Sequence, residues 1–338
     1  MLNMYNMNIK NSEIDIVVLW VDSEDAKWRT EFELYSSKLI DGDKDNIRFR
    51  DYNLIKYWFR GIEKFCPWAR KVHFVTSGHY PNWLNLNNKR LNFVKHSDYI
   101  PSEFLPTFNS HVIELNLHRI KELSENFVYF NDDFFVIDHI SDEHFFSGDI
   151  PNDCAIFSPI VPGGLSHILI NNVEIINKYY HKSNVIKKDF WKWYSPKYGL
   201  NLLRTICLTP WPHFVGFKDT HLPVSFKKST FVELWEKEPE IMEKTCFSKF
   251  RSNQDVSQYL VRYWQLVKGV FNPKNTMKYA SYNVLSNSSL YEIKQVIEKQ
   301  KKQIIIINDG DDIDFNYAKL ELEKSFELIL PEKSSFEN

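Results

Sequence analysis

Two neighbouring carboxylates interrupt an apolar stretch, YFNDDFFVID, and are well suited to chemistry. Asp132 and Asp133 follow Asn131 directly after a run of aromatic and β-branched residues. Because burying an isolated carboxylate is costly, such an acid normally gains a cation, hydrogen-bond donors or a raised pKa. A pair at the end of a strand can place one acid on a divalent cation and the other on a substrate or an orienting group. From these residues alone, a cation or arginine partner and an exposed Asp-Asp turn both remain open.

Basic side chains elsewhere are suited to a phosphorylated substrate. In HLPVSFKKS, His221 is a candidate general base because imidazole titrates near neutral pH, and Lys227 is a candidate phosphate contact. Arg204 in NLLRT and Arg251 in FSKFRSNQD suit a diphosphate, because a guanidinium group binds phosphate oxygens in pairs. Spacing alone does not separate these functions from a hydrogen-bonded loop histidine, solvated lysines and ordinary ion pairs.

Short apolar runs that alternate with helical patterns predict an α/β fold. The predicted strands are IDIVVLWV, KVHFVTSG, LNFVKH and NFVYFNDDFFV, which are rich in β-branched and aromatic residues. One helix is predicted from Tyr52 to Pro67, and another is predicted to begin at Asn109 or Ser110 and to run on to Leu123. The alternation predicts a mostly parallel, Rossmann-like or GT-A-like sheet with helices on both faces.

The ends of these strands are where a ligand is expected. In open α/β sheets, ligands bind in the crevice beyond the carboxyl ends of the strands. Asp22, Ser77, Gly78 and the Asp132 and Asp133 pair all come at or just after the ends of predicted strands. We therefore predict that they converge on one cleft.

The rest of the chain is less regular, and we predict three parts with soft boundaries. Residues 1–138 form the first part of an α/β core, and residues 139–280, with Pro-rich, Gly-rich and aromatic loops, form a second lobe or insertion. Residues 281–338 complete the core with the strand QIIIIND, a final helix, and a helix that Ser289 and Glu292 begin with a capping box. Many of the aromatic residues lie between 179 and 217, where core packing, glycan binding or membrane contact would each explain them.

Composition excludes several classes of protein. The net charge of −2 gives no field for nucleic acid, and four widely spaced cysteines indicate neither a disulfide scaffold nor a zinc site. The sequence has no P-loop, G-x-G-x-x-G, H-E-x-x-H or G-x-S-x-G motif. No apolar run approaches the roughly 18 residues of a membrane span, and the first residues lack a signal-peptide pattern. We expect a cytoplasmic enzyme, with attachment to the inner face of the plasma membrane left open.

Several blocks of the sequence resemble the Stealth family of sugar-1-phosphate transferases. IDIVVLWVDSED, the segment from RDYNLIKYWFRG to GHYPNWL, and the segment from LPTFNSHVIE to YFNDDFF are similar to its first two conserved blocks. THLPVSFKKS with FSKFRSNQDV is similar to the third block, and IIIIND with LPEKSSFE to the fourth. The family includes bacterial capsule and cell-wall polysaccharide polymerases and the animal lysosomal-enzyme N-acetylglucosamine-1-phosphotransferase.

The resemblance implies that a UDP-sugar donates its sugar-1-phosphate, such as N-acetylhexosamine-1-phosphate, to a hydroxyl of a polysaccharide or lipid-linked glycan, with release of UMP. The sequence also departs from the pattern that is common in the family. Asp22-Ser23 replaces Asn-Gly, Ser77 and His79 replace Asp and Gln, and Val224 after Pro223 replaces an aromatic residue or a histidine. These departures concern sugar and acceptor specificity more than the type of reaction. The sequence does not indicate an oligomeric state.

The family motifs, together with the basic side chains Arg204 and Lys227, give each candidate residue an expected function. Mg²⁺ or Mn²⁺ is expected on Asp132 or Asp133, and His221 is expected to deprotonate the acceptor. The residues expected to bind the donor are Trp20, Asp22, Asn131, Arg204, Lys227 and Arg251. Two alternatives remain: a metal-dependent GT-A-type glycosyltransferase that releases UDP, and a carbohydrate-binding protein without catalysis.

Overall fold

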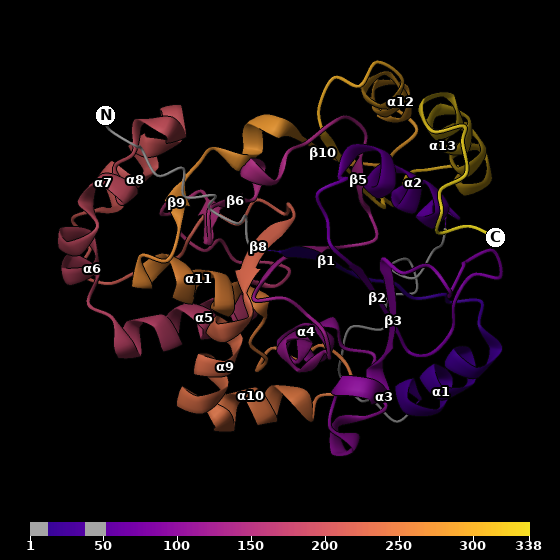
Figure 1. The fold of residues 1–338 in the computed structure, drawn as a ribbon. Coiled ribbons are helices and arrows are strands. Elements are labelled where there is room, and N and C mark those ends of the chain that lie inside the picture. Colours follow the sequence, from indigo (N-terminus) through magenta and orange to yellow (C-terminus); the bar gives the residue numbers. More distant parts are fainter. Residues whose placement is uncertain (1–12, 38–51) are drawn as a thin grey trace, which may run out of the picture.

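The computed structural model describes residues 13–37 and 52–338, and its centre is a five-stranded sheet (Figure 1). The strand order is β3-β2-β1-β4-β8, with β8 antiparallel to β4 and the other neighbours parallel. The strands are β1 (Ile14–Leu19), β2 (Val72–Thr76), β3 (Leu91–Lys95), β4 (Asn126–Phe130) and β8 (Val224–Lys227). The predicted α/β class with a mostly parallel sheet is confirmed.

Helices cover both faces of this sheet. In β1, Ile16 and Val18 pack into one core and Val17 packs into the other, because successive side chains of a strand point to opposite faces. All three side chains are fully buried. The continuous apolar run in this part of the sequence is therefore explained by a strand that serves two cores.

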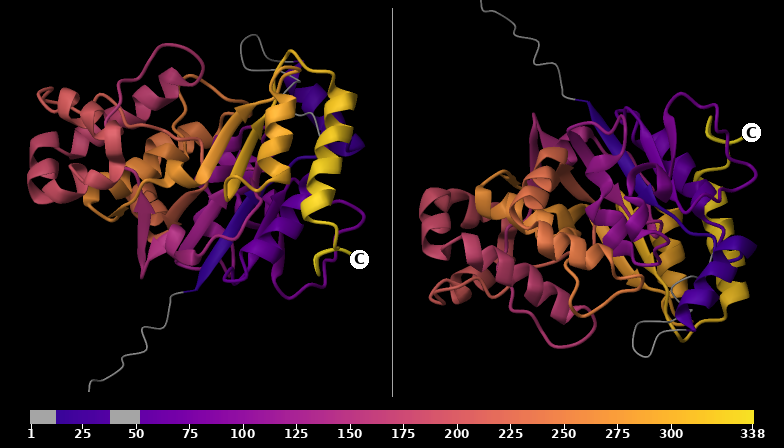
Figure 2. Two further views of the ribbon diagram at one scale, coloured as in Figure 1. Left: turned by 90° about the horizontal axis from the view of Figure 1, so that it is seen from above. Right: turned by 90° about the horizontal axis from the view of Figure 1, so that it is seen from below.

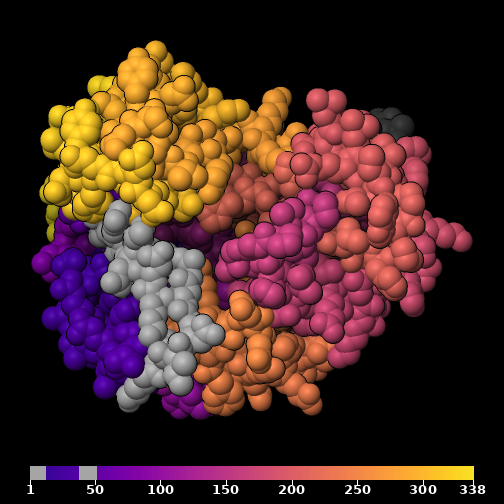
Figure 3. All heavy atoms as spheres, turned by 180° about the vertical axis from the view of Figure 1, so that it is seen from behind, coloured from indigo at the N-terminus to yellow at the C-terminus, as the bar shows by residue number. Residues whose placement is uncertain are grey.

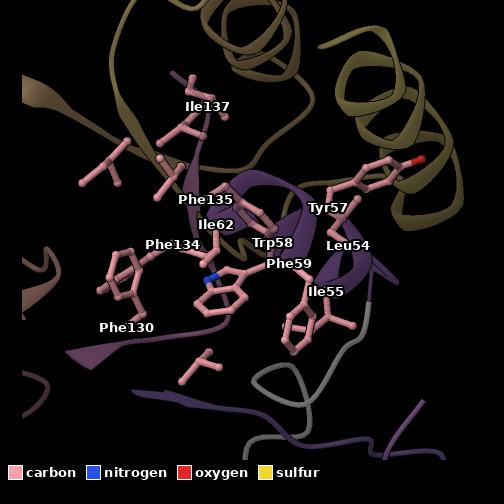
Figure 4. Packing of buried hydrophobic residues seen from close by; sticks show 14 of the residues in the cluster. Leu54, Ile55, Tyr57, Trp58, Phe59, Ile62, Phe130, Phe134, Phe135 and Ile137 are labelled. Carbon is pink, nitrogen blue, oxygen red and sulfur yellow. The ribbon is translucent and has the colours of Figure 1, made fainter. Parts of the chain in front are cut away.

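The first face is covered by α2 (Ile55–Phe65), which also packs against the short strand β5 (Phe134–Val136). Trp58 is fully buried, and its ring meets the ring of Phe130 edge-on with centroids 5.9 Å apart (Figure 4). A Cβ atom on Gly61 would lie 2.4 Å from the carbonyl oxygen of Val136. Only glycine therefore allows the helix to approach β5 this closely.

The second face is covered by α4 (Ser110–Leu115), α9 (Lys228–Lys237) and α11 (Gln258–Lys268), whose apolar side chains share a core with Val17 and Phe127 of the sheet. Several further helices flank these elements. They are α1 (Ala26–Ser36), α3 (His96–Tyr99), α10 (Pro239–Cys246) and the 3-10 helices Ser102–Phe104, Leu117–Arg119, Asp142–His144 and Thr276–Tyr279.

Two smaller sheets and an outer helical lobe complete the described chain. One sheet has the order β10-β11-β5 and lies under α12 and α13, and the other has the order β6-β7-β9. Their elements are β10 (Ala280–Val284), β11 (Ile304–Asn308), α12 (Leu290–Glu298), α13 (Phe315–Ile329), β6 (Phe146–Ser147), β7 (Ile150–Asp153) and β9 (Asn272–Pro273). The outer lobe, at the opposite end of the molecule from α13 (Figure 2), contains α5 (Ser166–Tyr179), α6 (Lys182–Lys188), α7 (Phe190–Trp193), α8 (Leu202–Leu208) and the 3-10 helix Pro196–Asn201.

Segments from the three predicted parts of the chain share these sheets. β8, from the middle of the chain, pairs with β4, and β11, near the C-terminus, pairs with β5. The division into residues 1–138, 139–280 and 281–338 stays a prediction.

Three local predictions were wrong. The segment NFVYFNDDFFV is not one strand but two, β4 and β5, because β5 pairs with β11 in a different sheet. The predicted helix from Asn109 ends at Leu115, where the Asn116 amide donates to the carbonyl oxygen of Val112. Ser289 forms no capping box, because its hydroxyl donates to backbone carbonyls instead of accepting from the helix.

The strand order creates a crevice between β1 and β4. β2 and β3 are added successively on one side of β1, and β4 is added on its other side. A sheet with this reversal binds ligands beyond the carboxyl ends of the two strands at the reversal. The segments that begin at Trp20 and Asn131 border that crevice.

Candidate active site

Four strand ends meet at one cavity of about 230 Å³. It is bordered by Trp20 after β1, Ser77 after β2, His96 after β3, and Asn131 and Asp132 after β4. The carboxyl ends of parallel strands lie at the same edge of a sheet, so these side chains come together although they are far apart in the sequence. Of the residues predicted to converge, Ser77 and Asp132 border this cavity, whereas Asp22, Gly78 and Asp133 do not.

Arg251 reaches the same cavity from a loop far along the chain. Its Nη2 donates to the hydroxyl oxygen of Ser110, 2.8 Å away, in the first turn of α4. The loop is fixed by the buried Asp255, whose Oδ2 accepts from Asn109 Nδ2 at 2.8 Å and from the Ser252 backbone at 2.9 Å. The Arg251 loop and the start of α4 are therefore one structural unit.

Aromatic rings form much of the remaining wall. Phe108 and Phe250 stack with centroids 5.3 Å apart, and Trp28 meets Phe108 edge-on at 5.7 Å. Trp20 stacks on Phe74 of β2 with centroids 5.5 Å apart. The cavity thus combines aromatic surface with a carboxylate and a guanidinium group.

Two histidines, His96 at the cavity and His79 beside it, are neutral at ordinary pH. His79 accepts from the Asp22 backbone at Nε2, 2.8 Å away, so its proton lies on Nδ1, which is 3.0 Å from Ser77 Oγ. Burial lowers the pKa of His79, and burial together with the nearby His79 lowers the pKa of His96 to about 3. A neutral imidazole at His96 can donate or accept a hydrogen bond from a ligand in the cavity.

The two adjacent acids face different surroundings. Asp132 lines the cavity with Arg251, whereas Asp133 Oδ2 lies 3.7 Å from His221 Nε2. The backbone carbonyl of Asp133 accepts from Ile307 at 3.1 Å, which ties this turn to β11. The turn therefore links the cavity with the His221 side of the molecule.

His221 is held between aromatic rings beside an open surface. Its imidazole meets the rings of Phe134 and Tyr282 edge-on, with centroids 5.0 and 5.5 Å apart. The side chain is 41% exposed, and its backbone has φ of 46°, a left-handed conformation that is unfavourable for residues other than glycine. From behind, Figure 3 shows the surface hollowed between the C-terminal elements in yellow and the segment of the outer lobe in magenta.

A buried ion network anchors the loop that leads to His221. Arg262 donates to both oxygens of Asp153 at 2.8 Å and to Asp219 Oδ1 at 3.0 Å, and the Tyr263 hydroxyl donates to Asp219 Oδ2 at 2.5 Å. Burial raises the pKa of Asp219 to about 6, although the Arg262 charge opposes this shift. Because Asp219 is two positions before His221, the network fixes the start of the His221 loop.

Asp132 and Asp133 could hold a metal ion only if a bound ligand supplied further coordinating atoms. Among residues 13–37 and 52–338, no three His, Cys, Asp or Glu side chains are grouped to hold a metal ion. Asp132 and Asp133 instead offer one carboxylate to each side of the turn. Mg²⁺ is commonly held by one or two carboxylates, with phosphate and water oxygens completing its coordination.

Arg204 and Lys227 lie elsewhere, contrary to prediction. Lys227 pairs with Asn126 at the start of β4, the end of the strand opposite to Asp132, and its Nζ donates to Asn126 Oδ1 at 2.9 Å. Arg204 is exposed on α8 in the outer lobe, and its Nη1 donates to Ser158 Oγ at 3.2 Å. Neither residue borders the cavity.

Asp22 lies beside the cavity rather than in it. With Trp20 and Trp28, it borders a neighbouring hollow, and its Oδ1 accepts from the Glu24 backbone at 2.9 Å. Its backbone also positions His79, as described above.

Three contributors to the site were missed in the sequence. His96 ends the predicted strand LNFVKH, so the strand-end argument applied to the other strands would have found it. Ser110 and Asp255 lie inside the motifs LPTFNSHVIE and FSKFRSNQDV, and the contacts of Ser110 with Arg251 and of Asp255 with Asn109 have no local signal.

Residues 48–153 match the family model of Stealth protein CR2, conserved region 2. Over 97% of its length and 99% of the relative's, the chain is 45% identical to the capsular polysaccharide phosphotransferase WcwK of Streptococcus pneumoniae. The chain belongs to the Stealth family. The family resemblance in the sequence is thereby confirmed, and so is the prediction of a phosphotransferase enzyme.

Other Stealth relatives align over nearly the whole chain. The exopolysaccharide phosphotransferase cps2G of Lactiplantibacillus plantarum is 38% identical over 96% of both chains, and the receptor polysaccharide phosphotransferase WefC of Streptococcus oralis is 35% identical over 96% of this chain and 99% of its own. A solved glycosyltransferase, GlyE of Streptococcus pneumoniae, aligns over 93% of this chain and 79% of its own, with 12% identity and a TM-score of 0.23. In the described part of this Stealth protein, no helix is long and apolar enough to cross a membrane.

Proposed function

We propose that this Stealth protein transfers a sugar-1-phosphate, such as N-acetylhexosamine-1-phosphate, from a UDP-sugar to a glycan hydroxyl and releases UMP. One observation carries the proposal: Asp132 and Arg251 share a cavity at the reversal of the sheet, and the neighbouring Asp133 faces His221. The proposed acceptor is a polysaccharide or lipid-linked glycan, and the names of the relatives support a polysaccharide. We place the reaction in the cytoplasm, at the inner face of the plasma membrane.

The cavity is sized for part of a nucleotide sugar. Ligand sites usually measure roughly 300–1,000 Å³, so about 230 Å³ accommodates a base and part of a ribose but not the whole donor. Trp20 and Phe108 offer rings for a planar base, and the neutral His96 offers a hydrogen bond. The diphosphate would extend from there toward Asp132 and Arg251.

Arg251 is the residue proposed to neutralise the diphosphate. Its guanidinium group is held by Ser110, so little side-chain freedom is lost when phosphate oxygens bind. Asn131 would orient the donor beside it, and Asp132 or Asp133 would hold Mg²⁺ or Mn²⁺ together with the phosphates. The ion, when bound, would offset phosphate charge.

His221 is proposed to accept the proton of the acceptor hydroxyl. The acceptor oxygen then bonds to the β-phosphorus, the bond from that phosphorus to the bridging oxygen breaks, and UMP leaves with the electron pair. The bond between the anomeric carbon and its oxygen stays intact, so the anomeric configuration is retained. Asp133, 3.7 Å from the imidazole, would stabilise the imidazolium that forms.

The nucleotide product tests this proposal. The purified protein would be incubated with UDP-N-acetylglucosamine and other nucleotide sugars, Mg²⁺ or Mn²⁺ and glycan acceptors, and the released nucleotide would be identified by chromatography. UMP, in a yield equal to the new phosphodiester, is the expected result. UDP would instead indicate a GT-A-type glycosyltransferase, and metal-independent sugar binding without turnover would indicate a binding protein.

A further inference from the structure

The outer lobe presents large apolar side chains to solvent. Trp191 is 79% exposed and Leu200 is 85% exposed, although side chains of these types are normally covered. We name the set of exposed residues the distal apolar surface: Phe190, Trp191, Leu200, Leu203, Ile206 and Trp211. Exposed apolar groups on this scale usually mark an interaction site.

The elements that carry this surface are fixed to one another. The Lys182 ammonium group, on α6, donates to the carbonyl oxygens of Leu208 and Trp211 at 2.5 and 2.9 Å, which joins α6 to the end of α8. The Tyr194 hydroxyl, just after α7, lies 2.5 Å from Thr209 Oγ1, just after α8. Figure 1 shows these three helices together at the end of the outer lobe. The elements that carry the distal apolar surface are therefore tied together.

The helix α8 has the reverse of the usual arrangement of a surface helix. Its fully buried residue is the polar Thr205, whereas Leu203 and Ile206, three positions apart on one face, are 58% and 48% exposed. A surface helix normally turns its apolar face to the core. Among residues 13–37 and 52–338, none covers the outward apolar face of α8, which is therefore open to a partner.

The charge around this surface indicates which partner. Residues 175–218 contain eight Lys or Arg side chains and one acidic residue, Asp189, although the whole chain has a net charge of −2. Lys187, Lys197 and Arg204 are exposed on the same helices and on the segment that joins α7 to α8. The partner should therefore have an anionic surface layer and an apolar layer under it.

We infer that the distal apolar surface docks onto an anionic lipid bilayer. Tryptophan favours the boundary between headgroups and acyl chains, leucine and isoleucine favour the layer below, and lysine attracts anionic headgroups. A glycan would account for the tryptophans but not for the aliphatic side chains, and a second copy of this chain would repel the basic residues. The inference does not depend on the donor site, because vesicle binding needs no nucleotide sugar.

Vesicle binding by the full chain tests this inference. Sedimentation with vesicles of phosphatidylglycerol and phosphatidylcholine, or of phosphatidylcholine alone, should show binding to the anionic vesicles that weakens as salt increases. Trp191→Ala combined with Leu203→Ala should lower the partition coefficient at least about tenfold. The matched control, Tyr291→Ala combined with Leu328→Ala, removes equally exposed apolar side chains from α12 and α13 and should leave binding unchanged.

A charge variant supplies a second test with the apolar residues intact. Lys187→Glu combined with Lys197→Glu should weaken binding to anionic vesicles by about fivefold or more for each charge, and circular dichroism should remain that of the parent protein. Equal binding by the parent and both surface variants would overturn the inference. Two other results would also overturn the inference. Trp191→Ala with Leu203→Ala could abolish a dimer seen in sedimentation, or binding to a soluble glycan, while binding to vesicles stays unchanged.

Discussion

The two edges of the central sheet use their charged residues differently. At the amino end, the fully buried Asp15 accepts from Arg70 at 2.8 and 2.6 Å, from His73 at 2.9 Å and from the Ser124 backbone at 2.8 Å. Burial alone would raise its pKa, but the hydrogen bonds from His73 and Arg70 lower the pKa of Asp15 to about 2. Every oxygen of this carboxylate is satisfied within the protein.

At the carboxyl edge, charged groups face space that a ligand can enter. Asp132 and Arg251 border a cavity, and the Asp133 carboxylate stands 3.7 Å from His221, farther than a hydrogen bond and with both side chains partly exposed. Asp15 is fully buried with both oxygens paired and is structural, whereas Asp132, exposed in the turn after β4, and the half-buried Asp133 are candidates for chemistry. Each prediction below tests whether a charged residue contributes to the stability of the fold or to turnover.

The largest effect is expected from Asp133→Asn, which should remove turnover without unfolding the protein. The substitution removes the charge that faces His221, while the backbone carbonyl that binds Ile307 is unchanged. Activity with added divalent metal and the melting temperature would both be measured. A large fall in melting temperature would instead show that Asp133, like Asp15, mainly stabilises the fold.

His221→Ala should lower turnover by roughly 10² to 10⁴, the usual contribution of a positioned general base. Because His221 is not in the donor cavity, the affinity for UDP-sugar should change little. Single-turnover rates and calorimetric titration would separate the two quantities. Near-normal turnover would remove His221 from the mechanism.

Arg251→Lys should lower kcat by about 10²-fold, because an ammonium group keeps the charge but not the paired geometry. Its hydrogen bond to Ser110 would also be lost. The control Ser110→Ala keeps the guanidinium group and should have a smaller effect. Equal activity of Arg251→Lys and the parent enzyme would exclude a paired phosphate contact.

Asp15→Asn should destabilise the fold by about 3 kcal/mol and leave turnover per folded molecule unchanged. The pKa of this acid is about 2 in the folded protein, below its ordinary value, so its stabilisation is complete above about pH 4 and is lost as the pH falls toward 2. Urea unfolding between pH 5 and 3 should show a steeper loss in the parent than in the variant. Parallel pH profiles would contradict the assigned pKa.

The smallest effect is expected from Lys227→Ala, about 1 kcal/mol or less of stability and no change in turnover. Lys227 contacts Asn126 and the Asp149 carbonyl at the amino edge, away from the cavity. Urea unfolding and steady-state kinetics would measure both effects. A loss of kcat comparable to that of Arg251→Lys would contradict the division between the two edges.

Local patterns were sufficient for the sheet and for the strand ends. β1, β2 and β3 coincide with apolar runs whose side chains pack into two cores, and the ends of β1, β2 and β4 identify Trp20, Ser77 and Asp132 at the cavity. Such strands are predicted from the periodicity of apolar residues and from residue composition, and both can be read from a single sequence.

Features that depend on long-range pairing could not be predicted. The strand β8 was not predicted, and its antiparallel pairing with β4 places Lys227 at the wrong edge for a phosphate. The break in NFVYFNDDFFV depends on β11, more than 160 positions later, which draws β5 into another sheet. The approach of Asp255 to Asn109 spans a similar stretch of chain, so the support for Arg251 is visible only in the fold.

A crystal structure with UDP-N-acetylglucosamine and Mg²⁺ would test most directly whether the carboxyl edge binds the donor. We expect the uracil ring in the cavity with Trp20, and the diphosphate between Asp132 and Arg251 with its β-phosphorus toward His221. Donor bound elsewhere, with Asp132 and Asp133 turned to bulk solvent, would contradict the account.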